Sequence, residues 1–153
     1  MIAITTDLEK LYQEVADKGI EVYKHFFKVG DKSKSLNLGS LKFIGLNFSS
    51  LKSTTEEKIA LAEEMAHFET DSFYHIKNDY NTPLQSLNRM KAEHKAKVWV
   101  FEKLLPYTNI QNAINSCSNI HELAEHLEVP EQTLREAIAY YQRKGIVFEL
   151  MEY

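Results

Sequence analysis

The apolar positions near the start of the chain recur at the spacing of an amphipathic helix. The members of this face are Leu8, Leu11, Val15, Val22 and Phe26. Because residues three or four apart share one side of a helix, the pattern predicts a helix from Asp7 to about Val29. Gly19 is expected to interrupt this helix or to end its first half.

The segment after this helix is polar at first and then apolar in short runs. Gly30 to Ser35 is polar and predicts a turn. Leu36 to Phe48 holds short apolar runs beside two glycines, and Lys42–Asn47 within it is the best strand candidate. We therefore expect one short strand in this region.

The next stretch predicts a helix from about Thr55 to Thr70. Two pairs at its start have the spacing of a capping box, in which a hydroxyl residue precedes a glutamate by three positions. These pairs are Ser53 with Glu56 and Thr54 with Glu57. The apolar face of this helix consists of Leu61, Met65 and Phe68.

Residues 61–67 of this helix, Leu-Ala-Glu-Glu-Met-Ala-His, carry the pattern that is richest in chemistry. It differs by one residue from the His-Glu-x-x-His helix of zinc metallopeptidases, because Glu63 stands where the first histidine would be. Residues four apart lie one above the other on a helix, so Glu63 and His67 could both reach a single metal ion. Glu64 could then hold a metal-bound water as general base.

A second interpretation of the same residues involves no metal. Glu-Glu-x-x-His arises easily in any acidic surface helix, and Glu63 and His67 lie roughly 100° or more from the centre of the apolar face. On this interpretation both side chains belong to a solvated face of the helix.

A further helix is predicted to start at Thr82-Pro83, with threonine as N-cap and proline at the first helical position. It should continue to about Leu105, where Pro106 stops it.

Glu93 lies on that helix among mostly apolar neighbours, which are Met90, Ala96, Val100 and Leu104. A carboxylate that points toward a core needs a partner, because an unpaired buried charge is costly. A metal ion would be one such partner. Lys97 lies in the same arc and could satisfy Glu93 by itself.

The last third of the chain, from about Ile110, looks helical. Residues 119–138 predict a helix, a tight turn at Glu128-Val129-Pro130 and a second helix, which is the arrangement of a helix-turn-helix. The second helix offers Gln132, Thr133 and Arg135 to DNA, but two glutamates among them would repel phosphate. We interpret this region as a packing or protein-recognition unit. The tyrosine pair at 140–141 and the tail at 146–148 are expected in the core or in an edge strand.

Composition excludes several classes of protein. The chain has 153 residues, enough for one domain with a real core, and its formal net charge of -4 argues against a general nucleic-acid binder. No apolar run approaches the length that spans a bilayer, and the N-terminus lacks the pattern of a signal peptide. Cys117 is the only cysteine, so no internal disulfide is possible, and we expect a cytoplasmic protein.

The combined pattern resembles the ImmA/IrrE-type metallopeptidases, particularly the small forms of phages and integrative elements of Firmicutes with Glu-Glu-x-x-His in place of His-Glu-x-x-His. The matching features are an N-terminal helix, a short strand, the stretch from Glu56 to His67, the segment 88–99 ending in Leu104-Leu105-Pro106, and the region 122–141. The resemblance covers roughly residues 7 to 145.

This resemblance implies a mostly helical α+β fold. It consists of a zincin-like core with a small β-sheet at residues 1–106, and a C-terminal helical, helix-turn-helix-like region at residues 107–153. The two parts would pack as a single compact unit.

The resemblance also implies roles for particular residues. Glu64 matches the catalytic glutamate, His67 the second histidine ligand and Glu93 the downstream acidic ligand, while Glu63 takes the position of the first histidine. Zn²⁺ is the expected metal, and Mn²⁺ or Fe²⁺ would also suit a site with two carboxylates. Asp71 and His75 are reserve ligands or ordinary polar surface.

The function implied is that of a metal-dependent endopeptidase acting on a cytosolic regulatory protein, specifically a helix-turn-helix repressor of a phage or mobile element. The substrate could add as a strand at the edge of Phe43–Leu46. The alternative is a non-catalytic protein with the peptidase fold that binds and regulates such a partner. Neither interpretation involves direct contact with nucleic acid or membrane.

Overall fold

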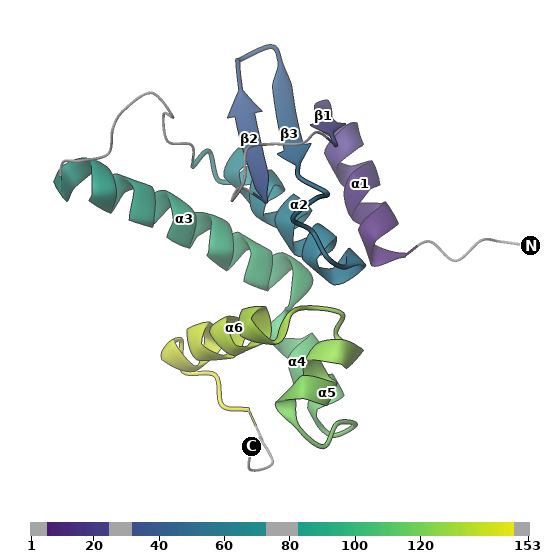
Figure 1. The fold of residues 1–153 in the computed structure, drawn as a ribbon. Helices are drawn as coiled ribbons and strands as arrows, with labels where there is room; N and C mark the ends of the chain where they lie inside the picture. The colour runs from purple at the N-terminus through teal and green to yellow at the C-terminus, as the bar shows by residue number, and fades with distance from the viewer. Residues whose placement is uncertain (1–5, 25–31, 73–82, 149–153) are drawn as a thin grey trace, which may run out of the picture. The chain divides into compact units, whose positions relative to one another are not determined.

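The computed structural model describes residues 6–24, 32–72 and 83–148, which contain helices and one small mixed sheet (Figure 1). The elements are α1 (Asp7–Asp17), β1 (Ile20–Tyr23), β2 (Ser33–Asn37), β3 (Lys42–Leu46), α2 (Thr54–Glu69), α3 (Pro83–Leu104), α4 (Tyr107–Ile114), α5 (Ile120–His126) and α6 (Glu131–Arg143). The prediction of a mostly helical α+β fold is confirmed.

Two compact units divide the chain, residues 1–97 and residues 98–153. The division falls within α3, so this helix contributes to both units. The predicted domain boundary after residue 106 stays a prediction, and each unit is described by itself below.

The first helix is shorter than the apolar spacing predicts. Helix α1 begins with a capping box, in which Thr6 and Glu9 accept from each other's backbone N–H groups, and it ends at Asp17. Gly19 follows with φ of 73°, a left-handed conformation that ends the helix, and β1 begins directly after it. The prediction of a helix through Val22 is therefore wrong beyond Asp17, and Phe26 and Val29 lie outside the described residues.

The sheet has the order β1-β3-β2, with β1 parallel and β2 antiparallel to β3. The predicted strand at Lys42–Asn47 is confirmed as β3, whose Ile44 and Leu46 are fully buried. The predicted turn at Gly30–Ser35 is wrong at its end, because β2 begins at Ser33. Ser33 pairs with Leu46 and Ser35 with Ile44, so both serines lie on the buried face of the sheet.

This strand order also corrects the expected place of the substrate. Strand β3 is the central strand and is paired on both sides, so it has no free edge at which another strand could add. Within the described part of the chain, β2 and β1 are the outer strands.

Helix α2 packs against β2 and β3, and α1 packs beside it (Figure 1). Its first turn is capped by Ser53, whose hydroxyl accepts from the Glu56 N–H. The Glu56 carboxylate accepts from the Lys52 N–H instead of that of Ser53, so the first predicted capping box forms only in part. The carboxylate of Glu57 instead accepts from the hydroxyl of Tyr12 on α1, at 2.5 Å. This hydrogen bond links α1 to the start of α2.

The second unit consists of the end of α3 and helices α4 to α6. Tyr141 on α6 donates to the carbonyl oxygens of Leu105 (2.8 Å) and Phe101 (3.2 Å). Phe148 is buried and its ring packs on that of Tyr141, so this residue of the tail belongs to the core, whereas Val147 is 83% exposed. Helices α5 and α6 are joined by a tight turn with Glu128 at φ of 56°, which confirms the predicted helix–turn–helix arrangement.

The remaining expectations for this fold concern the ends and lengths of helices. Helix α3 extends from Pro83 to Leu104 as predicted, while Thr82, the expected N-cap, lies outside the described residues. In the ranges that the structure describes, no helix is long and apolar enough to cross a membrane.

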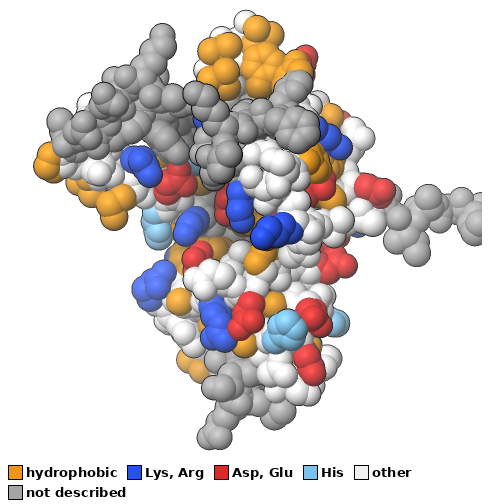
Figure 2. All heavy atoms as spheres, viewed as in Figure 1, with side chains coloured by type: hydrophobic (Ala, Val, Ile, Leu, Met, Phe, Trp, Pro, Cys, Tyr) orange, Lys and Arg blue, Asp and Glu red, His pale blue; other side chains and the backbone are white. Residues whose placement is uncertain are grey.

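The tip of the β2–β3 hairpin stands apart from the core. Figure 2 shows hydrophobic side chains gathered there, and Leu38 and Leu41 are 57% and 53% exposed. These two leucines bury little surface in the folded chain.

The buried face of β3 should therefore carry much more of the stability than the hairpin tip. We expect Ile44→Ala to lower the free energy of unfolding by about 2–5 kcal/mol, because it leaves a cavity in a fully buried position. Leu38→Ala, at the exposed tip, should change it by less than about 0.5 kcal/mol. Urea titration followed by circular dichroism measures both, and similar losses for the two variants would contradict this account of the sheet.

Candidate active site

His67 lies in the last turn of α2 and is 6% exposed. Its Nδ1 is 2.8 Å from the carbonyl oxygen of Ser72 and 3.2 Å from the Ser72 hydroxyl. The interpretation of Glu63 and His67 as a solvated face is therefore wrong for His67, while Glu63 is half-buried. Glu64, between them on the helix, is 8% exposed. Periodicity within α2 could not show this, because the sheet and α1 both pack against the helix.

The turn after α2 brings Ser72 back to the imidazole. The Ser72 N–H donates to the carbonyl of His67 (3.0 Å), and the Asp71 N–H donates to that of Phe68 (3.4 Å). These two bonds form a Schellman motif, with Asp71 in the left-handed position at φ of 49°. The end of the helix thus places a carbonyl acceptor directly at Nδ1.

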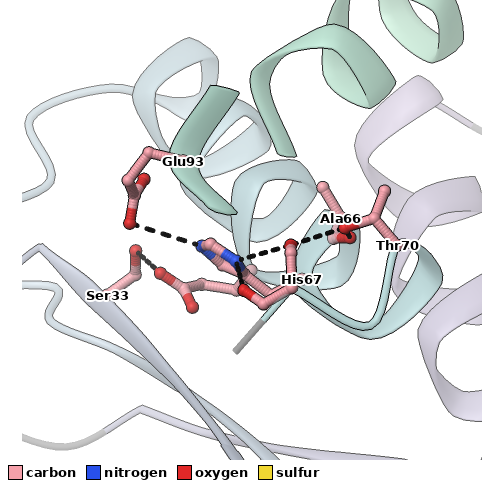
Figure 3. A network of polar contacts seen from close by, with 7 residues as sticks. Ser33, Ala66, His67, Thr70 and Glu93 are labelled. Atoms are coloured by element: carbon pink, nitrogen blue, oxygen red, sulfur yellow. Dashed lines mark hydrogen bonds and ion pairs between the residues drawn. The ribbon is translucent and has the colours of Figure 1, made fainter. Parts of the chain in front are cut away.

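The other ring nitrogen of His67 faces Glu93 of α3. Nε2 lies 3.8 Å from the Glu93 Oε1. The two side chains point toward each other in Figure 3. The Glu93 side chain is 42% exposed and Met90 is 67% exposed, so the expectation that Glu93 points into an apolar core is wrong. The buried side of this part of α3 is formed by Ala92 and Ala96. Lys97 is exposed, and its pairing with Glu93 stays a prediction.

Glu64 lies between the sheet and His67. The Ser33 hydroxyl on β2 donates to its Oε1 at 2.9 Å. Burial raises the pKa of Glu64 above its usual range, and the charge of Glu93 raises it further. Hydrogen bonds from Ser35 and Ser33 and the charge of a protonated His67 oppose this shift without cancelling it. The carboxyl group therefore holds its proton more tightly than an exposed glutamate does.

A comparison with protein families identifies the group to which this arrangement belongs. The model of the Peptidase M78 family, described as the IrrE N-terminal-like domain, matches residues 15–139. The chain belongs to this family. Membership confirms the resemblance and supports a peptidase-type function on a metallopeptidase-like fold. Neither the curated proteins nor the solved structures that were compared contain a match.

The M78 family is generally zinc-dependent, so the donor set can be tested against zinc. Two ligands at about 2.0–2.2 Å from a tetrahedral ion lie roughly 3.3–3.6 Å apart. The 3.8 Å between His67 Nε2 and Glu93 Oε1 is slightly wider, and both atoms are of types that zinc accepts. The two donor types therefore suit a metal site, and their separation would have to shorten by a few tenths of an ångström to bind one ion.

Glu63, the third predicted ligand, does not form a three-residue cluster with His67 and Glu93. Glu63 is half-buried, and the described ranges contain no group of three or more His, Cys, Asp or Glu side chains that could hold a metal ion. Its role as a ligand stays a prediction. Of the reserve ligands, Asp71 is exposed in the turn after α2, and His75 lies outside the described residues.

The sequence did not predict the hydroxyl groups of the site, which belong to Ser33, Ser35 and Ser72. Ser33 and Ser35 alternate with Lys34 and Leu36, which is a weak strand signal, but nothing local indicated that this strand would face a buried carboxylate. Ser72 follows the helix by three residues and carries no motif. Each becomes recognisable only when strand pairing and the helix end are known.

The raised pKa of Glu64 predicts how stability depends on pH in the metal-free protein. A carboxyl whose pKa is higher in the folded than in the unfolded chain destabilises the fold as pH rises from the unfolded value, about 4.3, through the folded value. Glutamine has no such charge. We therefore expect Glu64→Gln to gain stability relative to the unaltered chain between about pH 4 and pH 7. Urea midpoints at both pH values measure this.

Glu69→Gln, on the same helix, removes a charge together with its ion pair to Lys18, so it controls for the loss of a helix charge and of a surface ion pair. A Glu64→Gln variant whose relative stability is the same at both pH values would contradict the raised pKa.

Proposed function

We propose that this member of the M78 family is a metal-dependent endopeptidase that acts on a regulatory protein. One observation carries the proposal. A histidine Nε2 and a glutamate carboxylate face each other across 3.8 Å, next to the buried carboxyl group of Glu64.

The hydrogen bond at Nδ1 decides what can lie between His67 and Glu93. A backbone carbonyl oxygen can only accept, so Nδ1 carries a proton to donate to Ser72. In the neutral imidazole, Nε2 then presents a lone pair to the carboxylate. Two such groups repel unless a cation lies between them, either a proton on Nε2 or a metal ion. Histidine ligands commonly have this second hydrogen bond to a carbonyl.

We therefore assign His67 and Glu93 as ligands and Glu63 as the third ligand by its position in the motif. Zinc is the favoured metal, and Mn²⁺ or Fe²⁺ would suit the two carboxylates. When bound, the metal supplies a Lewis acid that polarises the scissile carbonyl and makes a water molecule more acidic.

Glu64 would act as the general base. It would take a proton from the attacking water and give it to the leaving amine, and a raised pKa serves both steps because the group can bind and release a proton nearer neutral pH. The hydrogen bond from Ser33 holds the carboxylate in place.

Strand β2 suggests how the substrate is held. It is an outer strand of the sheet and carries the serines that contact Glu64, so an extended segment added along its edge would pass close to that carboxylate. By the resemblance to ImmA/IrrE-type proteins, we propose a helix-turn-helix repressor of a phage or mobile element as the partner.

A non-catalytic function is the second candidate. Glu63 in the first-histidine position favours it, as does the lack of a three-ligand cluster within the described residues. Such a protein would keep the peptidase fold and bind a regulator without cleaving it.

Metal content tests the proposed site. Protein purified without a histidine tag or chelator should contain near-stoichiometric zinc, manganese or iron by ICP-MS. His67→Ala should lose it, because the variant removes the nitrogen ligand. His121→Ala, an exposed histidine on α5, should keep it. No bound metal, even after incubation with each ion, would favour the non-catalytic function.

Glu64→Gln tests the chemistry separately from the metal. The variant keeps the shape of the side chain but cannot accept the water's proton, so cleavage should fall by about 10²–10⁴-fold while metal content is retained. Mass spectrometry of a proteome-derived peptide mixture, with Glu69→Gln as control, measures the loss. If Glu64→Gln cleaves as well as the unaltered protein, or still relieves repression in a reporter assay, the proteolytic function is wrong.

A further inference from the structure

A chain of hydrogen bonds connects the His67 imidazole to the backbone of its own helix. His67 Nδ1 contacts the Ser72 hydroxyl, the Ser72 hydroxyl contacts the Thr70 hydroxyl at 2.5 Å, and Thr70 donates to the carbonyl of Ala66 at 2.8 Å. Figure 3 shows Thr70 and Ala66 on the side of His67 away from Glu93. Ser72 is buried at 5% exposure, whereas Thr70 is half-buried.

The carbonyl oxygens of Ala66 and Ser72 can only accept, and they determine which atom donates in each of these hydrogen bonds. The Thr70 hydroxyl gives its proton to Ala66, so at the contact with Ser72 it can only accept. The Ser72 hydroxyl therefore donates to Thr70 and turns a lone pair toward His67. Both Ser72 oxygens then accept from Nδ1, and both favour the tautomer with the proton on that nitrogen.

The backbone of the turn makes this arrangement possible. Asp71 has φ of 49°, in a region that residues other than glycine seldom occupy, and aspartate is among those that tolerate it. Because of this conformation the chain reverses after α2 and the Ser72 carbonyl reaches Nδ1. The turn serves both to end the helix and to orient the histidine.

We infer that Thr70, Asp71 and Ser72 are positioning residues that hold His67 as the Nδ1–H tautomer, with the Nε2 lone pair directed at Glu93. The inference deepens the proposed function, on which its consequence for metal binding rests. The tautomer itself is a property of the metal-free protein.

Removal of the Thr70 hydroxyl should weaken the preference for the Nδ1–H tautomer, which the Ser72 carbonyl alone would then support. In Thr70→Val the Ser72 hydroxyl loses its acceptor, and its proton is free to turn toward His67 Nδ1. In this variant a methyl group takes the place of the Thr70 hydroxyl beside the buried Ser72. The Ser72 hydroxyl then favours the Nε2–H tautomer, in which the nitrogen that faces Glu93 has no lone pair to offer.

Nitrogen-15 NMR of the histidine side chains measures this directly. The metal-free protein is labelled at histidine and titrated toward alkaline pH, and the tautomer is determined where the His67 signals no longer change with pH. His67→Ala identifies the signals of His67. We expect the Nδ1–H tautomer in the unaltered protein, a larger share of Nε2–H in Thr70→Val, and restoration in Thr70→Ser, which keeps the hydroxyl.

Zinc affinity gives a second readout that needs no peptidase activity. Competition with a chelating dye should show a zinc Kd about tenfold weaker in Thr70→Val than in Thr70→Ser, as expected for loss of a group that orients a ligand. Asp71→Gly should keep the affinity, because glycine adopts the left-handed conformation freely, whereas Asp71→Val should weaken it. Thermal melts identify any variant that fails to fold. If Asp71→Val does not fold, the comparison of Thr70→Val with Thr70→Ser still tests the inference.

Two results would overturn the inference. One is an Nε2–H tautomer in the unaltered metal-free protein. The other is a Thr70→Val variant with the same tautomer and the same zinc Kd as Thr70→Ser. If the unaltered protein binds no zinc at all, the proposed function fails, but the tautomer still decides the inference.

Discussion

Helix α2 is enclosed by the sheet and by α1, so the polar side chains in its second half must find partners within the protein. An unpaired carboxylate or imidazole at such a position carries a large desolvation cost. The arrangement of the site follows from this constraint. Glu64 is satisfied by hydroxyl groups on β2, and His67 is satisfied by the carbonyl of the turn that ends its own helix.

The hydrogen-bond partners of Glu64 and of His67 affect the two side chains differently. The serine hydroxyls donate to Glu64 but do not offset its burial, so the pKa of the carboxyl stays raised and the group is suited to take and return a proton. The Ser72 carbonyl accepts from Nδ1 and so determines which nitrogen of His67 meets Glu93. The proposed base and the proposed ligand thus lie three residues apart on one helix, each held by a different neighbouring segment.

Glu63 is the residue that separates this chain from the His-Glu-x-x-His pattern. Two carboxylates would offset more of a metal ion's charge than one, so a bound water would be less acidic and its attack on a peptide bond weaker. Looser metal binding and cleavage restricted to a narrow set of partners are the expected consequences. Such a balance suits an enzyme that inactivates one regulatory protein better than one that degrades many.

Local signals in the sequence predicted where helices form and indicated Glu64, His67 and Glu93 as residues of the site. Capping at Ser53 and the proline at 83 depend on residues close together in the chain, so α2 and α3 could be predicted. The pairing of β2, the burial of His67 and the role of Ser33 could not. They arise from contacts between residues far apart in sequence, such as Ser33 with Glu64, and only the packing of the sheet on α2 brings these together. Spacing within one helix shows which side chains share a side, whereas tertiary structure alone decides what covers that side.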